Sequence, residues 1–293
     1  MKNALLKQIA AMVIFGTIGI FVRYIPLQSS LIALIRGIVG TMFLILVIAA
    51  KKTPFSLCAI KKNLLWLVLS GGCIGFNWIL LFESYRYTSV AVSTLCYYMA
   101  PILVILTSPI ILKERITSKK GFCILAALLG MVFISGILNG SLPEAGELRG
   151  ILYGLAAATL YASVILLNKQ LKEISAYEKT ILQLGISAIV LIPYCIFTYQ
   201  PVMIENYTVV LILLWIVGIV HTGFAYYLYF GSMGKLKGQT VAIISYIDPV
   251  VAVAASVVVL REPMHLTDII GTLLILGSAL ISELPGKTKE SAS

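Results

Sequence analysis

The chain is a succession of apolar runs, each about as long as a membrane is thick. A bilayer core of about 30 Å needs roughly 20 apolar residues of helix to cross it. Of the 293 residues, 60% are hydrophobic and 12% are charged, against about 25% charged in soluble domains. The sequence therefore predicts an all-α polytopic membrane protein. Its ten predicted spans lie at about 4–24, 29–50, 64–83, 90–112, 119–138, 149–168, 178–198, 207–230, 239–260 and 267–284.

One of these runs occurs twice. VAVSTLCYYMAPILVILTSPIILKER from Val90 matches GQTVAIISYIDPVVAVAASVVVLREP from Gly238, which aligns Tyr98 with Tyr246, Pro101 with Pro249 and Glu114 with Glu262. Five spans separate the copies, and because five is odd the copies insert in opposite directions. The sequence thus predicts ten transmembrane helices as two inverted five-helix repeats, a recurring plan of secondary transporters. The predicted parts are residues 1–140, residues 141–285 and a cytoplasmic tail at 286–293.

The lysines predict the orientation. All of them fall on the side of the membrane that carries both termini, whereas the other side has only Arg23, Arg86, Arg149 and Arg261. The positive-inside rule then places both termini in the cytoplasm of a multi-pass protein of the cell membrane. The first apolar run lacks a cleavage site and is expected to remain as a span. An anionic lipid leaflet accounts for the net charge of +10 without a nucleic-acid partner.

Taken together, these features resemble the EamA branch of the drug/metabolite transporter superfamily. The resemblance rests on two five-helix halves, a proline inside the fourth helix of each, Glu114 and Glu262 closing those helices, and glycines in the fifth helices (Gly130, Gly277). It implies alternating access and transport of small metabolites, often amino acids. It also implies a central cavity lined mainly by the first, third and fourth helices of each half.

Pro101 and Pro249 are predicted to break the fourth helix of each repeat. Proline has no amide hydrogen and crowds the preceding turn, so the carbonyls of Tyr97 and Ser245, four residues earlier, lose their helical partner. Such carbonyls can face a cavity and accept hydrogen bonds from a substrate or from water. The alternative is that the prolines only kink the helices.

Asp248 is the one aspartate or glutamate well inside a predicted span. Inserting a charge near a helix centre costs about 2.5–3.5 kcal/mol, so a functional role is expected by default. The sequence predicts that Asp248 binds either a substrate ammonium or a coupling proton. A structural role, with the side chain protonated or capping a neighbouring helix, is the alternative.

His221, in the eighth span, is the second candidate for proton coupling, because histidine titrates near neutral pH. The other interpretation is a hydrogen-bonded core residue. No second His or Cys stands at ligand spacing, so no metal site is predicted.

Arg36, inside the second span, is predicted to pair with Glu83 or to meet a substrate carboxylate. The alternative is that it extends to the interface as an anchor. The charged residues near the outer span ends are gate or loop ion pairs, or solvated helix ends: Glu83, Arg86, Arg261 and Glu262.

Aromatic side chains on the expected cavity helices form, with Asp248, a possible cation-attracting box, since ammonium groups bind ring faces. Packing explains the same rings equally well. The full set of substrate-binding candidates is Asp248, Tyr246, Ser245, Tyr97, Tyr98, Trp78, Asn77, Tyr161, Tyr226 and His221.

The sequence contains no nucleotide-binding, metal-binding or nucleophile motif, which predicts a non-enzyme without cofactors. The predicted function is secondary active transport of small polar metabolites, with amino acids or amines favoured, driven by a gradient and with proton coupling as an option. A polytopic enzyme for lipid-linked substrates and a channel are the alternatives. The predicted partners are the small-molecule substrate and the lipid bilayer, with protons as an option, in a monomer or a homodimer.

Overall fold

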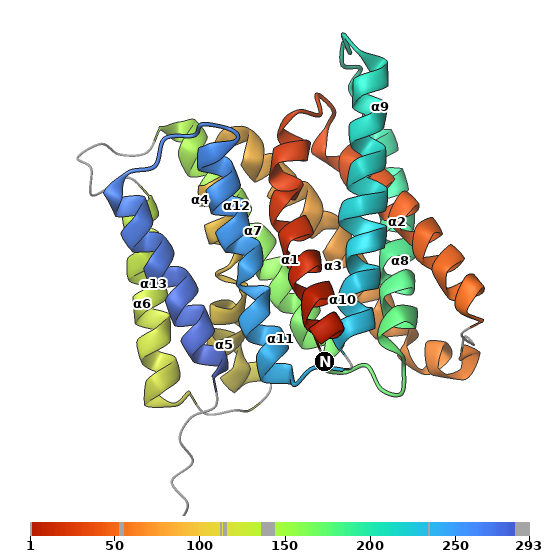
Figure 1. Ribbon diagram of the computed structural model, residues 1–293, viewed down its shortest axis with the longest axis horizontal. Coiled ribbons are helices and arrows are strands. Elements are labelled where there is room, and N and C mark those ends of the chain that lie inside the picture. Colours follow the sequence, from red (N-terminus) through yellow and green to blue (C-terminus); the bar gives the residue numbers. More distant parts are fainter. Residues whose placement is uncertain are drawn as a thin grey trace, which may run out of the picture.

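The structure is a computed structural model that describes residues 2–52, 56–111, 113, 116–135, 144–233 and 235–284. Helices make up most of this part of the chain and form one bundle (Figure 1). The first half contains α1 (Lys2–Arg23), α2 (Ser29–Lys51), α3 (Leu57–Tyr87), α4 (Val90–Tyr97), α5 (Ala100–Ile111) and α6 (Ser118–Ile134). The second half contains α7 (Ala145–Asn168), α8 (Ala176–Thr198), α9 (Tyr207–Trp215), the π-helix η2 (Ile216–Phe224), α10 (Ala225–Met233), α11 (Gly238–Ser245), α12 (Ile247–Val258) and α13 (Leu266–Glu283).

Eight helical stretches within the described ranges are long and apolar enough to cross a membrane, among them α4 with α5 and the continuous stretch Tyr207–Met233. The two other predicted spans are α6, which has 17 residues, and α11 with α12, which are interrupted at Tyr246. The predicted all-α polytopic fold is therefore confirmed. The predicted boundary between residues 140 and 141, the tail at 286–293 and Glu114 lie outside the described residues.

The two halves run in opposite directions. In Figure 1, α1 begins at the bottom and α7 near the top, and α4 lies above α5 whereas α11 lies below α12. The packing is exchanged in the same way: α1 packs against α10 and α12, while its counterpart α7 packs against α3, α4 and α5. Equivalent helices of the two halves also pack together, namely α2 with α8 and α6 with α13. This exchange of packing partners is the arrangement expected of two inverted repeats.

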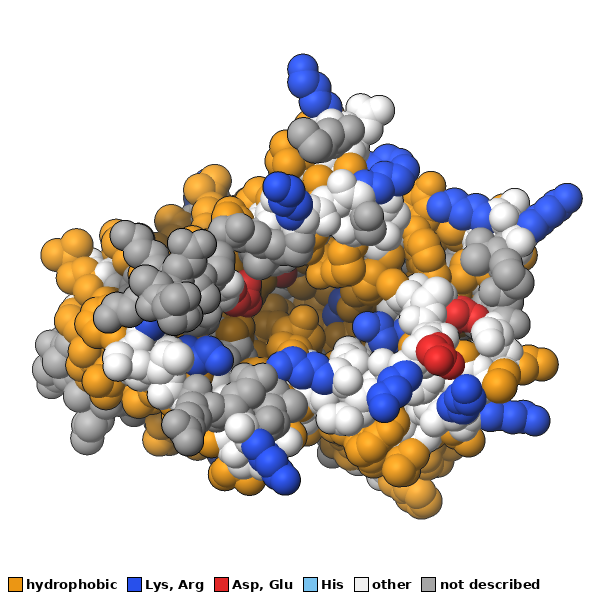
Figure 2. Space-filling view, turned by 90° about the horizontal axis from the view of Figure 1, so that it is seen from below, with side chains coloured by type: hydrophobic (Ala, Val, Ile, Leu, Met, Phe, Trp, Pro, Cys, Tyr) orange, Lys and Arg blue, Asp and Glu red, His pale blue; other side chains and the backbone are white. Residues whose placement is uncertain are grey.

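The two ends of the bundle differ. At the bottom of Figure 1, α1 begins and α13 ends. Figure 2 looks onto this end and shows Lys and Arg side chains around a central hollow. This end, at which α1 begins and α13 ends, is named the basic end. At the opposite end, α1 and α12 finish and α4 begins (Figure 1).

Glycine sets two of the closest helix contacts. At Gly16 of α1, a Cβ atom would lie 2.5 Å from the carbonyl oxygen of Asp248 and 2.7 Å from the Cβ of Val251. In the α6–α13 pair, a Cβ on Gly130 would lie 2.9 Å from the carbonyl oxygen of Gly271. Small residues allow such close approach between membrane helices. Gly16 thus brings α1 directly against the start of α12.

Candidate functional site

The helix interruptions of the two repeats face one another. In the first half, α4 ends at Tyr97 and α5 begins at Ala100, just before Pro101. In the second half, α11 ends at Ser245 and α12 begins at Ile247, just before Pro249. The missing amide of each proline ends the regular hydrogen-bonding pattern at this point. Because α4 packs against α12, the two interruptions form one site.

Tyr98 joins these interruptions across the repeat interface. Its hydroxyl donates to Asp248 Oδ2 at 2.9 Å and lies 3.5 Å from the carbonyl oxygen of Ser245. The Ser245 carbonyl stands four residues before Pro249, so it is one that the proline leaves without a helical partner. The first repeat therefore supplies the polar group that meets the broken helix of the second.

Asp248 keeps one oxygen free. Its Oδ1 has no hydrogen-bond partner in the described part of the chain and is not sealed from solvent. A carboxylate oxygen accepts hydrogen bonds from ammonium or guanidinium groups more strongly than a neutral oxygen does. The free oxygen of Asp248 is thus an acceptor left open at the interruption.

A row of tyrosine rings adjoins Asp248. Tyr97 stacks on Tyr161 with 5.1 Å between ring centroids, and the ring of Tyr98 lies 6.2 Å from Tyr97 and 6.3 Å from Tyr246. Tyr161 is 39% exposed. The hydroxyl of Tyr246 is buried without a partner among the described residues. Four of the predicted aromatic candidates are therefore brought together.

Tyr226, Trp78 and Asn77 have other contacts. Tyr226 stacks on Phe230 at 5.7 Å, and Trp78 lies under Arg36. Asn77 is buried; its Nδ2 donates to the carbonyl oxygen of Ala157 at 2.5 Å, and its Oδ1 lies 3.5 Å from the Tyr97 hydroxyl. Asn77 therefore links α3 to α7 and contacts the Tyr97 hydroxyl.

Arg36 and Glu83 do not form the predicted ion pair. Glu83 pairs with Arg86, one turn away on α3, at 3.4 Å. Arg36 is buried, donates from Nε to Thr222 Oγ1 at 2.8 Å, and places its guanidinium carbon 4.1 Å from the Trp78 ring centroid. The physical reason is that Glu83 finds its cation on its own, partly exposed helix end, whereas Arg36 is buried between α3 and η2.

His221 is enclosed in the π-helix. Its Nε2 lies 3.1 Å from Thr17 Oγ1, its Nδ1 lies 3.3 Å from the Ile216 carbonyl oxygen, and Phe21 packs on the ring at 4.7 Å. Within the described residues no hydrogen bond joins it to Asp248. Residues 16 and 17 of α1 stand between the two, since Gly16 contacts the Asp248 backbone. The structure therefore does not bring together the two predicted proton carriers.

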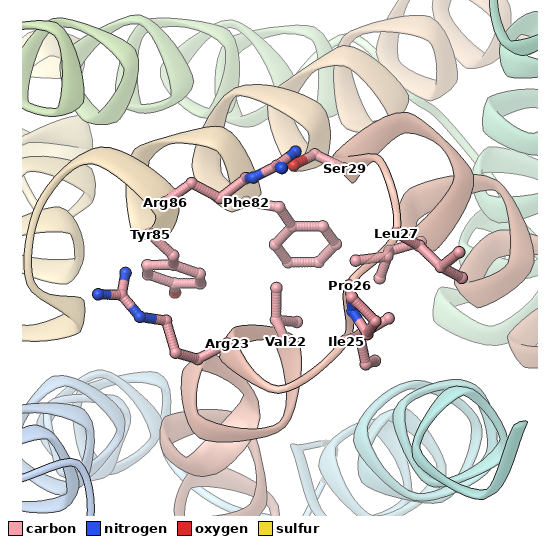
Figure 3. A pocket seen from close by; sticks show the side chains of 10 residues that line it. Val22, Arg23, Ile25, Pro26, Leu27, Ser29, Phe82, Tyr85 and Arg86 are labelled. Carbon is pink, nitrogen blue, oxygen red and sulfur yellow. The ribbon is translucent and has the colours of Figure 1, made fainter. Parts of the chain in front are cut away.

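At the opposite end, Glu262 joins three helix ends. Its Oε2 accepts from the Val90 amide at 2.9 Å and from Ser256 Oγ, and its Oε1 lies 3.9 Å from Arg23. Arg23 also donates to the carbonyl oxygen of Thr88 at 3.4 Å. These residues are named the Glu262 clasp. A small pocket beside it is lined by Arg23, Phe82, Tyr85 and Arg86 among others (Figure 3).

The contacts of the Glu262 clasp were not predicted from the sequence, in which Glu262 is expected to be part of a gate or loop ion pair, or a solvated helix end. The side chain is 13% exposed. Its amide partner stands 172 residues earlier in the chain, and no local pattern signals that contact. The molecule is thus held together at this end and hollow at the basic end (Figure 2).

Comparisons with known proteins cover most of the chain. The model of the EamA-like transporter family matches twice, at residues 2–136 and 148–283. A Bacillus subtilis protein named uncharacterized transporter YxxF is 32% identical over 282 residues, covering 95% of this chain and 89% of its own. An uncharacterized transporter of Archaeoglobus fulgidus is 27% identical over 276 residues, covering 92% of each chain.

A solved structure described as a crystal structure of a protein shares the fold, with a TM-score of 0.62 at 17% identity over 97% of both chains. The family match spans nearly all of the described helices. The resemblance seen in the sequence is thereby confirmed, and the chain belongs to the EamA-like transporter family.

Proposed function

We propose that this membrane transporter is a secondary active carrier of small polar metabolites with an ammonium group, namely amino acids or amines. The observation that carries the proposal is the free oxygen of Asp248 at the paired helix interruptions, next to the hydroxyl of Tyr98. An anionic acceptor among tyrosine faces suits an ammonium group, which binds both carboxylates and rings. The substrate would then meet residues of both repeats at once.

A coupling proton is the second candidate for the same carboxylate. Ionisable residues inside membrane spans commonly serve as proton relays. The Tyr98 hydroxyl donates to Oδ2 of this carboxyl, so a coupling proton would bind at Oδ1. Loss of the negative charge should weaken substrate binding in the first case and abolish proton-driven uptake in the second. One substitution at Asp248 therefore distinguishes the two roles.

Alternating access is supported by the difference between the two ends. The basic end is hollow (Figure 2) and the opposite end is held by the Glu262 clasp. Since lysine-rich segments favour the cytoplasmic side, we place both termini in the cytoplasm and take the hollow to open there. Without a nucleotide-binding motif in the sequence, a solute or ion gradient would supply the driving force.

The test is Asp248→Asn in the full-length protein, assayed in liposomes for substrate binding, substrate exchange and pH-driven uptake. If Asp248 binds the ammonium, the loss of one charge-assisted contact of about 1.5–3 kcal/mol should weaken binding by about tenfold or more. If it carries the proton, binding and exchange should persist and pH-driven accumulation should vanish.

Glu173→Gln is the matched control, because the Glu173 side chain is 75% exposed and pairs only with Lys62 among the described residues. It should behave as the wild type does in all three assays. A folded Asp248→Asn variant that also behaves as the wild type would remove Asp248 from the site and refute the proposal.

A further inference from the structure

Arg36 is a buried cation without an anion. It is 6% exposed, and no ion pair of the described residues includes it. Its one hydrogen bond in this part of the chain runs from Nε to Thr222. The two terminal nitrogens have no partner there, yet they are not sealed from solvent. A charged group inside a membrane bundle usually has a partner or a functional role.

The guanidinium of Arg36 packs against aromatic rings and is hydrogen-bonded through Nε. The Trp78 ring lies 4.1 Å from its central carbon, and Phe82 lies 5.8 Å away. The Thr222 hydroxyl donates to the Val217 carbonyl at 3.0 Å, so its oxygen is oriented to accept from Arg36. Nε donates to Thr222 and one face of the guanidinium packs against Trp78, so the donors that remain are the two terminal nitrogens. These form the fork that binds a carboxylate through two parallel hydrogen bonds.

The π-helix and a glycine make this arrangement possible. The Thr222 to Val217 bond spans five residues, which is the spacing of a π-helix, a form that often marks functional sites. At Gly40 of α2, a Cβ would lie 2.4 Å from Thr222 Cγ2. Only a residue without a side chain lets α2 approach η2 this closely, and that approach brings Arg36 to Thr222.

Arg36 and Asp248 are linked through neighbouring side chains without forming an ion pair. Arg36 lies over the ring of Trp78, and the adjacent Asn77 contacts Tyr97, whose ring adjoins Tyr98, the hydrogen-bond partner of Asp248. Yet among the described residues no ion pair joins them within 4.0 Å. Each charge therefore lacks a close counter-charge. A small molecule with a carboxylate and an ammonium group supplies both counter-charges at once.

We infer that Arg36 is the specificity-determining residue that binds the substrate carboxylate, so that the carrier selects zwitterions over simple amines. This inference rests on the proposed function, in which Asp248 binds the ammonium group. Arg36 thereby adds a second charged contact with the substrate. It lies on α2, the second span, which is not among the helices expected to line the cavity.

The experiment measures binding to the purified full-length protein by calorimetry, first for the twenty standard amino acids. The best binder is then compared with its decarboxylated amine and its deaminated acid. Wild-type protein should bind the amino acid at least about tenfold more tightly than the amine, the worth of one charge-assisted contact. Arg36→Gln should abolish this preference, because it should weaken binding of the amino acid and change the affinity for the amine by no more than about twofold.

Arg36→Lys keeps the charge and loses the fork, so it should retain an intermediate preference. It also decides the question if Arg36→Gln fails to fold. Asp248→Asn is the converse variant, and it should weaken the amino acid and the amine while sparing the deaminated acid.

Equal weakening of amino acid and amine by Arg36→Gln, or wild-type binding of the amine as tight as that of the amino acid, would overturn the inference. In both cases the proposed function survives if Asp248→Asn still weakens amine binding. Failure of every amino acid and amine to bind would overturn both.

Discussion

Replacement of Glu262 by glutamine should open the end of the molecule opposite the basic end. The carboxylate accepts from the Val90 amide and from Ser256, and these bonds tie the start of α4 to the end of α12. A hydrogen bond to a charged group contributes about 1.5–3 kcal/mol. The Arg23 contact, at 3.9 Å with Arg23 39% exposed, adds about 0–1 kcal/mol.

Glutamine keeps the shape and one carbonyl acceptor but loses the charge. The expected net loss is therefore about one charged contact, 1.5–3 kcal/mol. If the clasp forms only while this end is closed, its loss shifts the ratio of closed to open molecules by roughly ten- to 150-fold.

The assay is the distribution of distances between spin labels at Tyr24 and Leu266, introduced as cysteines after the five native cysteines have been replaced. Both positions are exposed, at the end of α1 and the start of α13. Glu262→Gln should add a longer-distance population. Glu144→Gln is the control at the same end, because Glu144 is exposed and its side chain makes no cap hydrogen bond. An unchanged distribution in folded Glu262→Gln would refute the role of the clasp.

Three further predictions concern packing, His221 and orientation. Gly16→Ala should lower the melting temperature in detergent, because overpacking costs about 1–3 kcal/mol of stability. Gly72→Ala is the control, since open space surrounds Gly72, and equal melting temperatures of the two variants would contradict the α1–α12 contact. His221→Phe should lower the melting temperature by removing two buried polar contacts, yet keep pH-driven uptake; the reverse pattern would identify His221 as a proton carrier. A cysteine at Ser56 should react with impermeant maleimide from the cytoplasmic side, and labelling only from outside would reverse the orientation.

The spans and helix interruptions could be predicted because their causes are local. Apolar length alone identifies a membrane helix, and the missing amide of Pro101 or Pro249 disturbs the turn before it. The helices stop at Tyr97 and at Ser245, within four residues of the prolines. The opposite directions of the two copies could also be predicted, because five spans, an odd number, separate them in the sequence.

The partners of the charged residues could not be predicted, because they depend on distant segments. Arg36 meets Thr222, 186 residues away, through a π-helix whose five-residue spacing leaves no trace in hydropathy. The predicted partner, Glu83, is the acidic residue at the outer end of the third predicted span. Glu262 likewise meets the amide of Val90, a backbone group that every residue except proline carries.

We propose that this chain carries small ammonium-bearing metabolites by alternating access. The most direct measurement is counterflow in liposomes of the purified protein, loaded with an unlabelled amino acid and exposed outside to a trace of the same labelled compound. For such a carrier we expect transient, saturable accumulation of the label, and we expect Asp248→Asn to reduce it. A non-saturable leak would indicate a channel, and formation of a lipid product without counterflow would indicate an enzyme; either result would refute the proposal that this protein is a carrier.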